Sequence, residues 1–164
     1  MRGLMMDNGL TINSLIEHTN KFHPKTEIVS RSIEGPIHRY TYAESYVRMN
    51  KLANALFRLG IRKGDRVGTL AWNGYRHFEL YFGISGIGAI CHTINPRLFE
   101  DQLAYIINHA NDKILFCDLS IVPILKNIVA DISKVETFVI MTDKEHNPDL
   151  VDPKEEILKK QHET

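Results

Sequence analysis

Apolar residues in the first sixty positions recur every three or four residues in two stretches, which predicts two amphipathic helices. The first runs from a cap at Thr11 through Phe22. Its apolar stripe is Ile12, Leu15, Ile16, Thr19 and Phe22. The β-forming runs 27–31 and 37–41 follow, separated by a turn containing Gly35 and Pro36. They predict an antiparallel hairpin.

The second helix begins with a capping box. Thr41 is suited to accept from the amide of Glu44, whose side chain can return to the amide of Thr41. Gly60 is suited to a left-handed C-terminal cap. The expected core stripe of this helix is Tyr46, Met49, Leu52, Ala53, Leu56 and Leu59.

From residue 64 onward the pattern alternates between strands and helices. Strands are predicted at 66–71, 89–94, 113–117 and 135–141, and helices at 75–86, 100–110 and 119–130. Right-handed crossovers between parallel strands place the helices on both faces of the sheet. The fold class is therefore α/β, a parallel sheet preceded by an N-terminal helix and a β-hairpin. Gly83, Gly86 and Gly88 are expected to let a helix and the next strand approach closely.

The domain boundary is predicted at residue 142. Residues 1–142 form the α/β region, and 143–164 form a densely charged connecting segment without aromatic residues. Asp152 and Pro153 predict the start of a short helix within it.

Composition narrows the class of protein. The 164 residues include 20 Lys and Arg and 20 Asp and Glu, with no basic stripe, which argues against a nucleic-acid binder. The least charged stretch, 80–93, is interrupted by glycines and is too short to cross a membrane. No signal-peptide pattern opens the chain, and Cys91 and Cys117 are too far apart for a paired motif. We expect a cytoplasmic protein with two reduced core thiols.

The sequence offers few candidates for chemistry. Its eight histidines show no metal-ligand spacing, the run GISGI at 83–87 misses the nucleophile-elbow pattern, and no phosphate-binding glycine loop is present. We therefore predict neither a metal ligand nor a catalytic residue. Asn95, Pro96 and Arg97 follow a predicted parallel strand, where ligands of open α/β sheets bind. The alternative is a plain turn with Arg97 facing water.

Several motifs in one order resemble the adenylate-forming enzymes, specifically fatty acyl-CoA synthetases. They are YTYAE at 40–44, GDRV at 64–67, AWN at 71–73, GIGAICHTINPRL at 86–98 and LAYIINHA at 103–110. The resemblance covers roughly 10–141, so the chain resembles an incomplete, N-terminal part of a long-chain or medium-chain fatty acid CoA ligase.

The resemblance implies a two-step reaction. ATP and Mg²⁺ convert a fatty acid to an acyl adenylate, and coenzyme A then forms the thioester. It also implies that Asn95, Pro96 and Arg97 border the CoA tunnel, and that a homodimer is possible. The family's phosphate loop, Mg²⁺ residues and catalytic lysine are expected beyond Thr164, so none of these cofactors is expected to bind this chain strongly by itself.

A non-enzymatic binding or assembly module with the same fold is the alternative function. A Ser/Thr/Gly-rich loop with a lysine, encoded soon after Thr164, would favour the ligase. We also expect strands such as 113–117 to lack part of their cover in the isolated chain, which would promote self-association.

The isolated 164-residue chain is expected not to form an acyl adenylate, because it contains no recognisable group to hold the triphosphate or stabilise the leaving pyrophosphate. ATP–pyrophosphate exchange in the presence of fatty acids measures this step. Exchange above background with any fatty acid would contradict the prediction.

Overall fold

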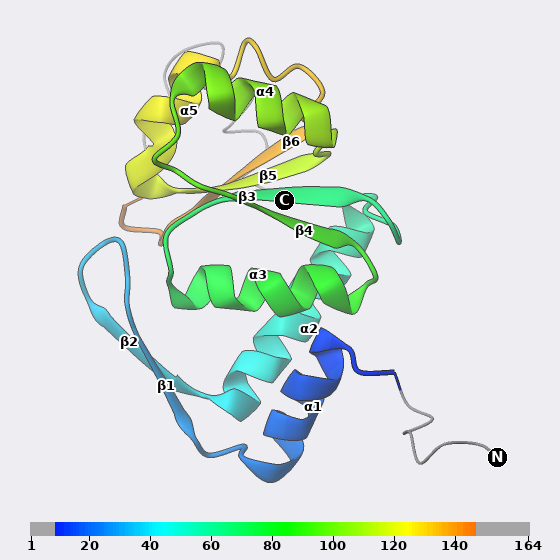
Figure 1. The fold of residues 1–164 in the computed structure, drawn as a ribbon. Coiled ribbons are helices and arrows are strands. Elements are labelled where there is room, and N and C mark those ends of the chain that lie inside the picture. The colour runs from blue at the N-terminus through cyan, green and yellow to red at the C-terminus, as the bar shows by residue number, and fades with distance from the viewer. Residues whose placement is uncertain (1–8, 147–164) are drawn as a thin grey trace, which may run out of the picture.

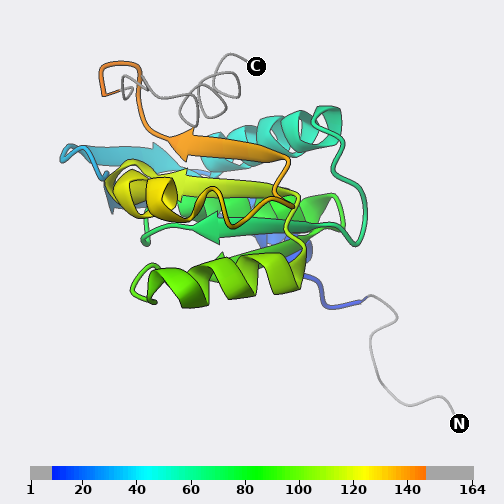
Figure 2. The same ribbon diagram turned by 90° about the horizontal axis from the view of Figure 1, so that it is seen from above.

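A four-stranded parallel sheet forms the middle layer of the protein in this computed structural model, which describes residues 9–146. The strands lie in the order β4-β3-β5-β6, side by side and pointing the same way (Figures 1 and 2). They are β3 (Arg66–Leu70), β4 (Ile90–Ile94), β5 (Ile114–Asp118) and β6 (Thr137–Met141). The predicted α/β class and parallel sheet are confirmed.

Helices cover both faces of this sheet, as predicted. Helices α2 (Tyr42–Arg58) and α3 (Tyr75–Gly86) pack on one face, and α4 (Glu100–Ala110) and α5 (Val122–Ile128) on the other (Figure 1). Side chains of β5 alternate between the two cores. Ile114 and Phe116 join the α2–α3 core, while Leu115 and Cys117 join the α4–α5 core.

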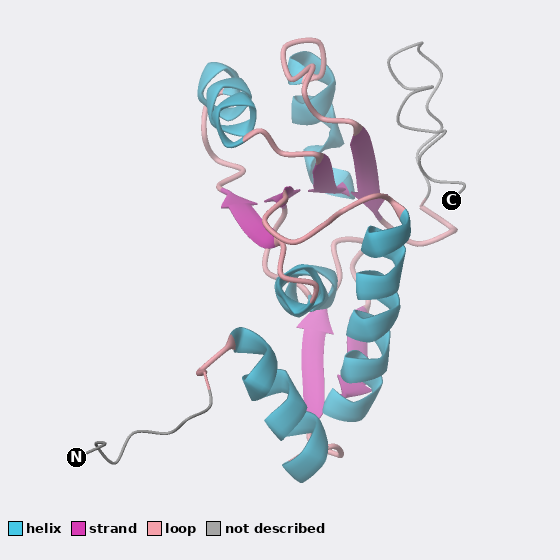
Figure 3. Cartoon of the chain, turned by 90° about the vertical axis from the view of Figure 1, so that its right-hand side faces the viewer, coloured by secondary structure: helices cyan, strands magenta, loops and turns pink. Residues whose placement is uncertain are grey.

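The N-terminal elements form a separate extension beside α3. Helix α1 (Ile12–Phe22) packs on α2 and α3, and the two-stranded hairpin β1 (Glu27–Arg31) and β2 (Ile37–Thr41) stands apart from the main sheet (Figure 3). The predicted capping box is confirmed, since the amide of Thr41 donates to Glu44 Oε2 at 2.7 Å and the amide of Glu44 donates to Thr41 Oγ1 at 3.3 Å. Gly60 has the predicted left-handed backbone, with φ 88°.

Three expectations about burial were wrong. Only Ile16 of the α1 stripe is buried, while Ile12, Leu15 and Phe22 are 52%, 57% and 58% exposed. No further element among residues 9–146 covers the outer side of this helix, so three of the five residues of its stripe face out. Leu59 is also exposed, because the helix has ended before it. Conversely, all five residues of β5 are buried, so this strand does not lack cover.

The predicted helix 119–130 is divided in two. A 3-10 turn (Leu119–Ile121) precedes α5, which ends at Ile128. Pro123 has no amide hydrogen to donate, so it is tolerated in the first turn of a helix and not in its interior. Strand β6 begins two residues later than predicted because the amide of Val135 donates into a turn, to Ile132 O at 3.2 Å.

The charged segment lies largely outside the described residues. The short helix predicted from Pro153 falls there, and the domain boundary at residue 142 stays a prediction. No helix within 9–146 is long and apolar enough to cross a membrane.

Gly83 permits close packing of two helices. A Cβ built on it would lie 2.8 Å from Leu52 Cδ2 on α2, and one on Gly86 would lie 3.3 Å from Asn13 Nδ2 on α1. The close approach predicted at these glycines is therefore between helices. Gly88 is required for its turn, with φ 75°.

His77 on α3 is a buried, neutral histidine. Its Nδ1 lies 3.1 Å from Trp72 O and its Nε2 3.0 Å from Thr69 Oγ1. A carbonyl only accepts, so Nδ1 carries the proton and Nε2 accepts from the hydroxyl of Thr69. Burial lowers the pKa of His77 below its ordinary value of 6.5.

Gly83→Ala is expected to destabilise the fold by about 1 kcal/mol, the difference between an overpacking cost of about 1 to 3 kcal/mol and a helix-propensity gain of about 1 kcal/mol. Urea denaturation measures this. Gly86→Ala is the matched control, since a Cβ there meets only the end of the half-buried Asn13 side chain, at 3.3 Å rather than 2.8 Å. Gly83→Ala as stable as Gly86→Ala would contradict the packing argument.

His77→Asn is expected to flatten the loss of stability at acidic pH. Because the folded pKa of His77 is lowered, the unfolded chain takes up the proton first, and the free energy of unfolding falls as pH drops below about 6.5. Asparagine cannot titrate but can still donate to Trp72 O. Thermal unfolding of both proteins, measured between about pH 7.5 and about pH 5 in steps of about half a pH unit, tests this prediction. Stability curves of the two proteins that run parallel across this pH range would show that the titration of His77 does not cause the loss of stability at acidic pH.

Candidate functional site

The carboxyl ends of β3, β4 and β5 meet at one edge of the sheet because the strands are parallel. The loops that follow β3 and β4 enclose a hollow of about 310 Å³. Its lining residues are Ala71, Trp72, Asn73, His77, Tyr81, Thr93, Ile94, Asn95 and Pro96. Two of the three predicted site residues, Asn95 and Pro96, therefore lie in one pocket at the expected place.

The loop after β4 is held in a defined turn. Asn95 Oδ1 accepts from the amide of Arg97 at 3.0 Å, and its backbone oxygen accepts from the amide of Leu98 at 3.3 Å. Pro96 fixes its own φ. The Arg97 side chain is exposed at the rim of the hollow and forms no ion pair among the residues described. The turn expected in the alternative interpretation is present, and the side chain of Arg97 is exposed, as that interpretation also expects.

Trp72 was not predicted as a site residue, although it lies two residues after the end of β3. The Arg97 guanidinium carbon lies 5.5 Å from the Trp72 ring centroid, within cation–π range. The ring is only partly covered, with the residue 37% exposed. The sequence signal for Trp72 as a site residue was an aromatic residue just after a parallel strand. Its contact with Arg97 depends on how the loops after β3 and β4 meet.

Asp118, the last residue of β5, is the second group that sequence reasoning missed. Its Oδ2 accepts from the Trp72 amide at 2.7 Å, and the residue is 4% exposed. Burial raises the pKa of this carboxyl, while the Trp72 amide and the nearby charge of Arg76 oppose the rise. The two partners are 46 residues apart in sequence, so no local pattern links them.

Another buried pair lies away from this hollow. His92 Nδ1 contacts Asp112 Oδ2 at 2.7 Å, and Asp112, just before β5, is fully buried. Desolvation raises the pKa of Asp112, and His92 partly offsets this rise.

Cys91 has its pKa raised to about 11 by burial, so it is a poor nucleophile at neutral pH. Within 9–146 no three His, Cys, Asp or Glu side chains gather as a metal site.

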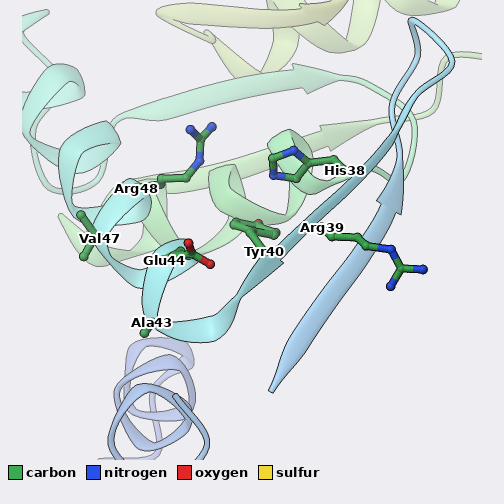
Figure 4. A pocket seen from close by; sticks show the side chains of 7 residues that line it. All are labelled: His38, Arg39, Tyr40, Ala43, Glu44, Val47 and Arg48. Carbon is green, nitrogen blue, oxygen red and sulfur yellow. The ribbon is translucent and has the colours of Figure 1, made fainter. Parts of the chain in front are cut away.

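A larger hollow, of about 550 Å³, lies between β2 and α2 (Figure 4). Several of its polar groups already have structural partners, while His38 Nε2 and Tyr40 Oη are buried without a hydrogen-bond partner among the described residues. The Arg48 guanidinium binds Glu79 on α3 through two contacts of 2.6 and 3.1 Å, and the His38 ring stacks on Tyr75 at 3.9 Å. Arg39 points away from the hollow (Figure 4) and pairs with Glu27. The His38–Tyr75 stacking attaches the hairpin to α3, while the Arg48–Glu79 pair joins α2 to α3.

Comparison with known proteins gives relatives of one kind. The chain is 46% identical over 141 residues to a 3-methylmercaptopropionyl-CoA ligase of Ruegeria lacuscaerulensis, covering 86% of this chain and 26% of the relative. It is 44% identical over 147 residues to a medium-chain-fatty-acid–CoA ligase of Ectopseudomonas oleovorans, covering 90% and 27%. The chain thus spans about a quarter of the length of these relatives.

A solved fatty acyl CoA synthetase of Mycobacterium tuberculosis shares the fold. Its TM-score is 0.69 at 24% identity, covering 80% of this chain and 26% of that one. The family model described as "AMP-binding enzyme" matches residues 16–163. These matches, together with a parallel sheet whose loops enclose a pocket at its carboxyl edge, show that the chain belongs to the AMP-binding enzyme family.

Proposed function

We propose that the protein containing this chain is a fatty acyl-CoA synthetase, which activates a carboxylate with ATP and then transfers the acyl group to coenzyme A. The observation that carries the proposal is the 44% identity to a medium-chain-fatty-acid–CoA ligase over 90% of this chain. The relative named for 3-methylmercaptopropionyl-CoA supports acid–thiol ligation with a different acid. A fatty acid as the substrate, rather than another carboxylic acid, is part of the proposal.

The role proposed for this part of the enzyme is to form the entrance for coenzyme A. Asn95 and Pro96 line the hollow at the carboxyl edge, and the exposed Arg97, 5.5 Å from the ring of the lining residue Trp72, forms no ion pair among residues 9–146. Coenzyme A carries phosphates, which a guanidinium binds well. The described residues provide no cluster for Mg²⁺, and we assign no catalytic residue and no ATP-binding step to them.

A binding or assembly module is not favoured, because the relatives reported above are named as ligases. A homodimer and a cytosolic location stay predictions. Both cysteines are free thiols, Cys117 fully buried in the core, which fits the reduced state expected for them.

Arg97→Ala in the complete protein is expected to raise the Michaelis constant for CoA about tenfold or more, since a charge-assisted contact contributes about 1.5 to 3 kcal/mol. Adenylation should be unchanged, because Arg97 would not touch the fatty acid or ATP. Thioester formation at varied CoA and ATP–pyrophosphate exchange measure the two steps separately.

Arg62→Ala is the matched control, because Arg62 is also exposed, lies 4.1 Å from the ring of Phe57 and precedes the amino end of β3, whereas the hollow is at its carboxyl end. Arg62→Ala should change neither the Michaelis constant for CoA nor the rate of ATP–pyrophosphate exchange. An unchanged Michaelis constant for CoA in Arg97→Ala, or an equal loss in both steps, would overturn the entrance assignment.

A further inference from the structure

We propose that Asp118 is a positioning residue that fixes Trp72, and through Trp72 the side chain of Arg97. No contact between Asp118 and a ligand is involved. The inference rests on the proposed function only where it concerns CoA, because the placement of Trp72 is a property of this chain alone.

Both backbone polar groups of Trp72 are held by side chains from other elements. Asp118 Oδ2 on β5 accepts from its amide at 2.7 Å, and His77 Nδ1 on α3 donates to its carbonyl at 3.1 Å. Thr69 on β3 in turn holds His77 Nε2 at 3.0 Å. A loop residue tied at both its donor and its acceptor cannot rotate its peptide planes without breaking a buried contact.

The hydrogen bond to Asp118 is also the stronger of the two that hold the backbone of Trp72. A hydrogen bond to a carboxylate is shorter and about twice as strong as one between neutral groups. The carboxyl is almost fully buried, at 4% exposed, and makes no ion pair among the described residues. Burying an unpaired carboxylate is unfavourable, so the hydrogen bond from the Trp72 amide compensates for it, together with the nearby charge of Arg76.

This arrangement spans three neighbouring strands. The order β4-β3-β5 places Asp118 at the end of β5, Trp72 after β3 and Arg97 after β4. The ring of Trp72 lies against the guanidinium at 5.5 Å, which restricts the otherwise flexible arginine to the rim of the hollow. Pre-ordering a side chain lowers the entropy lost when a ligand binds. Asp118 therefore acts on the ligand only through Trp72 and Arg97.

The placement of Trp72 can be measured directly, because it is the only tryptophan in the chain. Asp118→Ala in the 164-residue chain is expected to shift the emission to longer wavelength and to raise the acrylamide quenching constant. Asp118→Asn keeps an oxygen acceptor and should lie between wild type and Asp118→Ala. Asp112→Ala is the matched control, since it removes another buried carboxylate of the same sheet that does not contact Trp72.

All spectra are taken where circular dichroism shows the variant folded. If Asp118→Ala does not fold, Asp118→Asn, which replaces the charged acceptor of the Trp72 amide by a neutral one, decides the question. Emission and quenching equal to wild type in a folded Asp118 variant, or an equal change in Asp112→Ala, would overturn the proposal.

The complete protein provides the second measurement. Asp118→Ala is expected to raise the Michaelis constant for CoA roughly threefold to tenfold, a loss of about 0.7 to 1.4 kcal/mol, with adenylation unchanged. In an Arg97→Ala background the same substitution should have no further effect on CoA, because its route runs through Arg97. Asp118→Asn should restore part of the affinity.

The two proposals fail differently. If Arg97→Ala leaves the Michaelis constant for CoA unchanged, the entrance assignment fails, and the fluorescence of Trp72 alone decides whether Asp118 positions it. If Arg97→Ala raises the constant while folded Asp118→Ala leaves it unchanged, the entrance assignment stands and the positioning role is overturned. Additive effects of the two substitutions would also overturn it.

Discussion

Burial of β5 on both faces is the constraint on which the rest of the structure depends. Its alternate side chains enter two different cores, so the strand is stable only when a helical layer covers each face. The crossover helices α4 and α5 supply one layer, and the crossover helix α3 together with α2 supplies the other. A connection between two parallel strands has to run outside the sheet, which places these crossover helices on its faces. The two free edges of the sheet, at β4 and β6, are where the described residues leave strand hydrogen-bonding groups without a neighbouring strand.

The same parallel arrangement explains why the candidate site lies where it does. All strands point one way, so the loops that leave them gather at one edge, and the segments after β3 and β4 become neighbours. Their contact creates the hollow and brings Arg97 against Trp72. Rigid strands and short loops give such a site a fixed geometry.

Buried polar groups cost stability unless they are paired. This chain buries several on or beside its main sheet, and three have specific partners: Asp118 has the Trp72 amide, His77 has Thr69 and Trp72 O, and Asp112 Oδ2 has His92. Asp112 Oδ1 has no hydrogen-bond partner among residues 9–146. The first two sets lie together beneath the hollow. Such paired groups at a pocket restrict the backbone to one conformation.

The sequence by itself determined the class of elements, most of their boundaries and the place of the candidate loop. Capping residues, turn glycines and hydrophobic period act over a few residues, and the helices at 75–86 and 100–110 and both hairpin strands fall where these local signals predicted. Asn95, Pro96 and Arg97 followed from the position of a loop after a parallel strand.

Only the tertiary structure decided which apolar stripes are buried and which polar groups meet. The stripe of α1 has helical period along its whole length, but burial depends on whether a neighbour exists, and for Ile12, Leu15 and Phe22 none does among residues 9–146. Trp72 and Asp118 are 46 residues apart, and neither has a local pattern that marks a site. Hydrogen bonds and ring contacts require atoms within a few ångströms, and the packing of the whole sheet sets those distances.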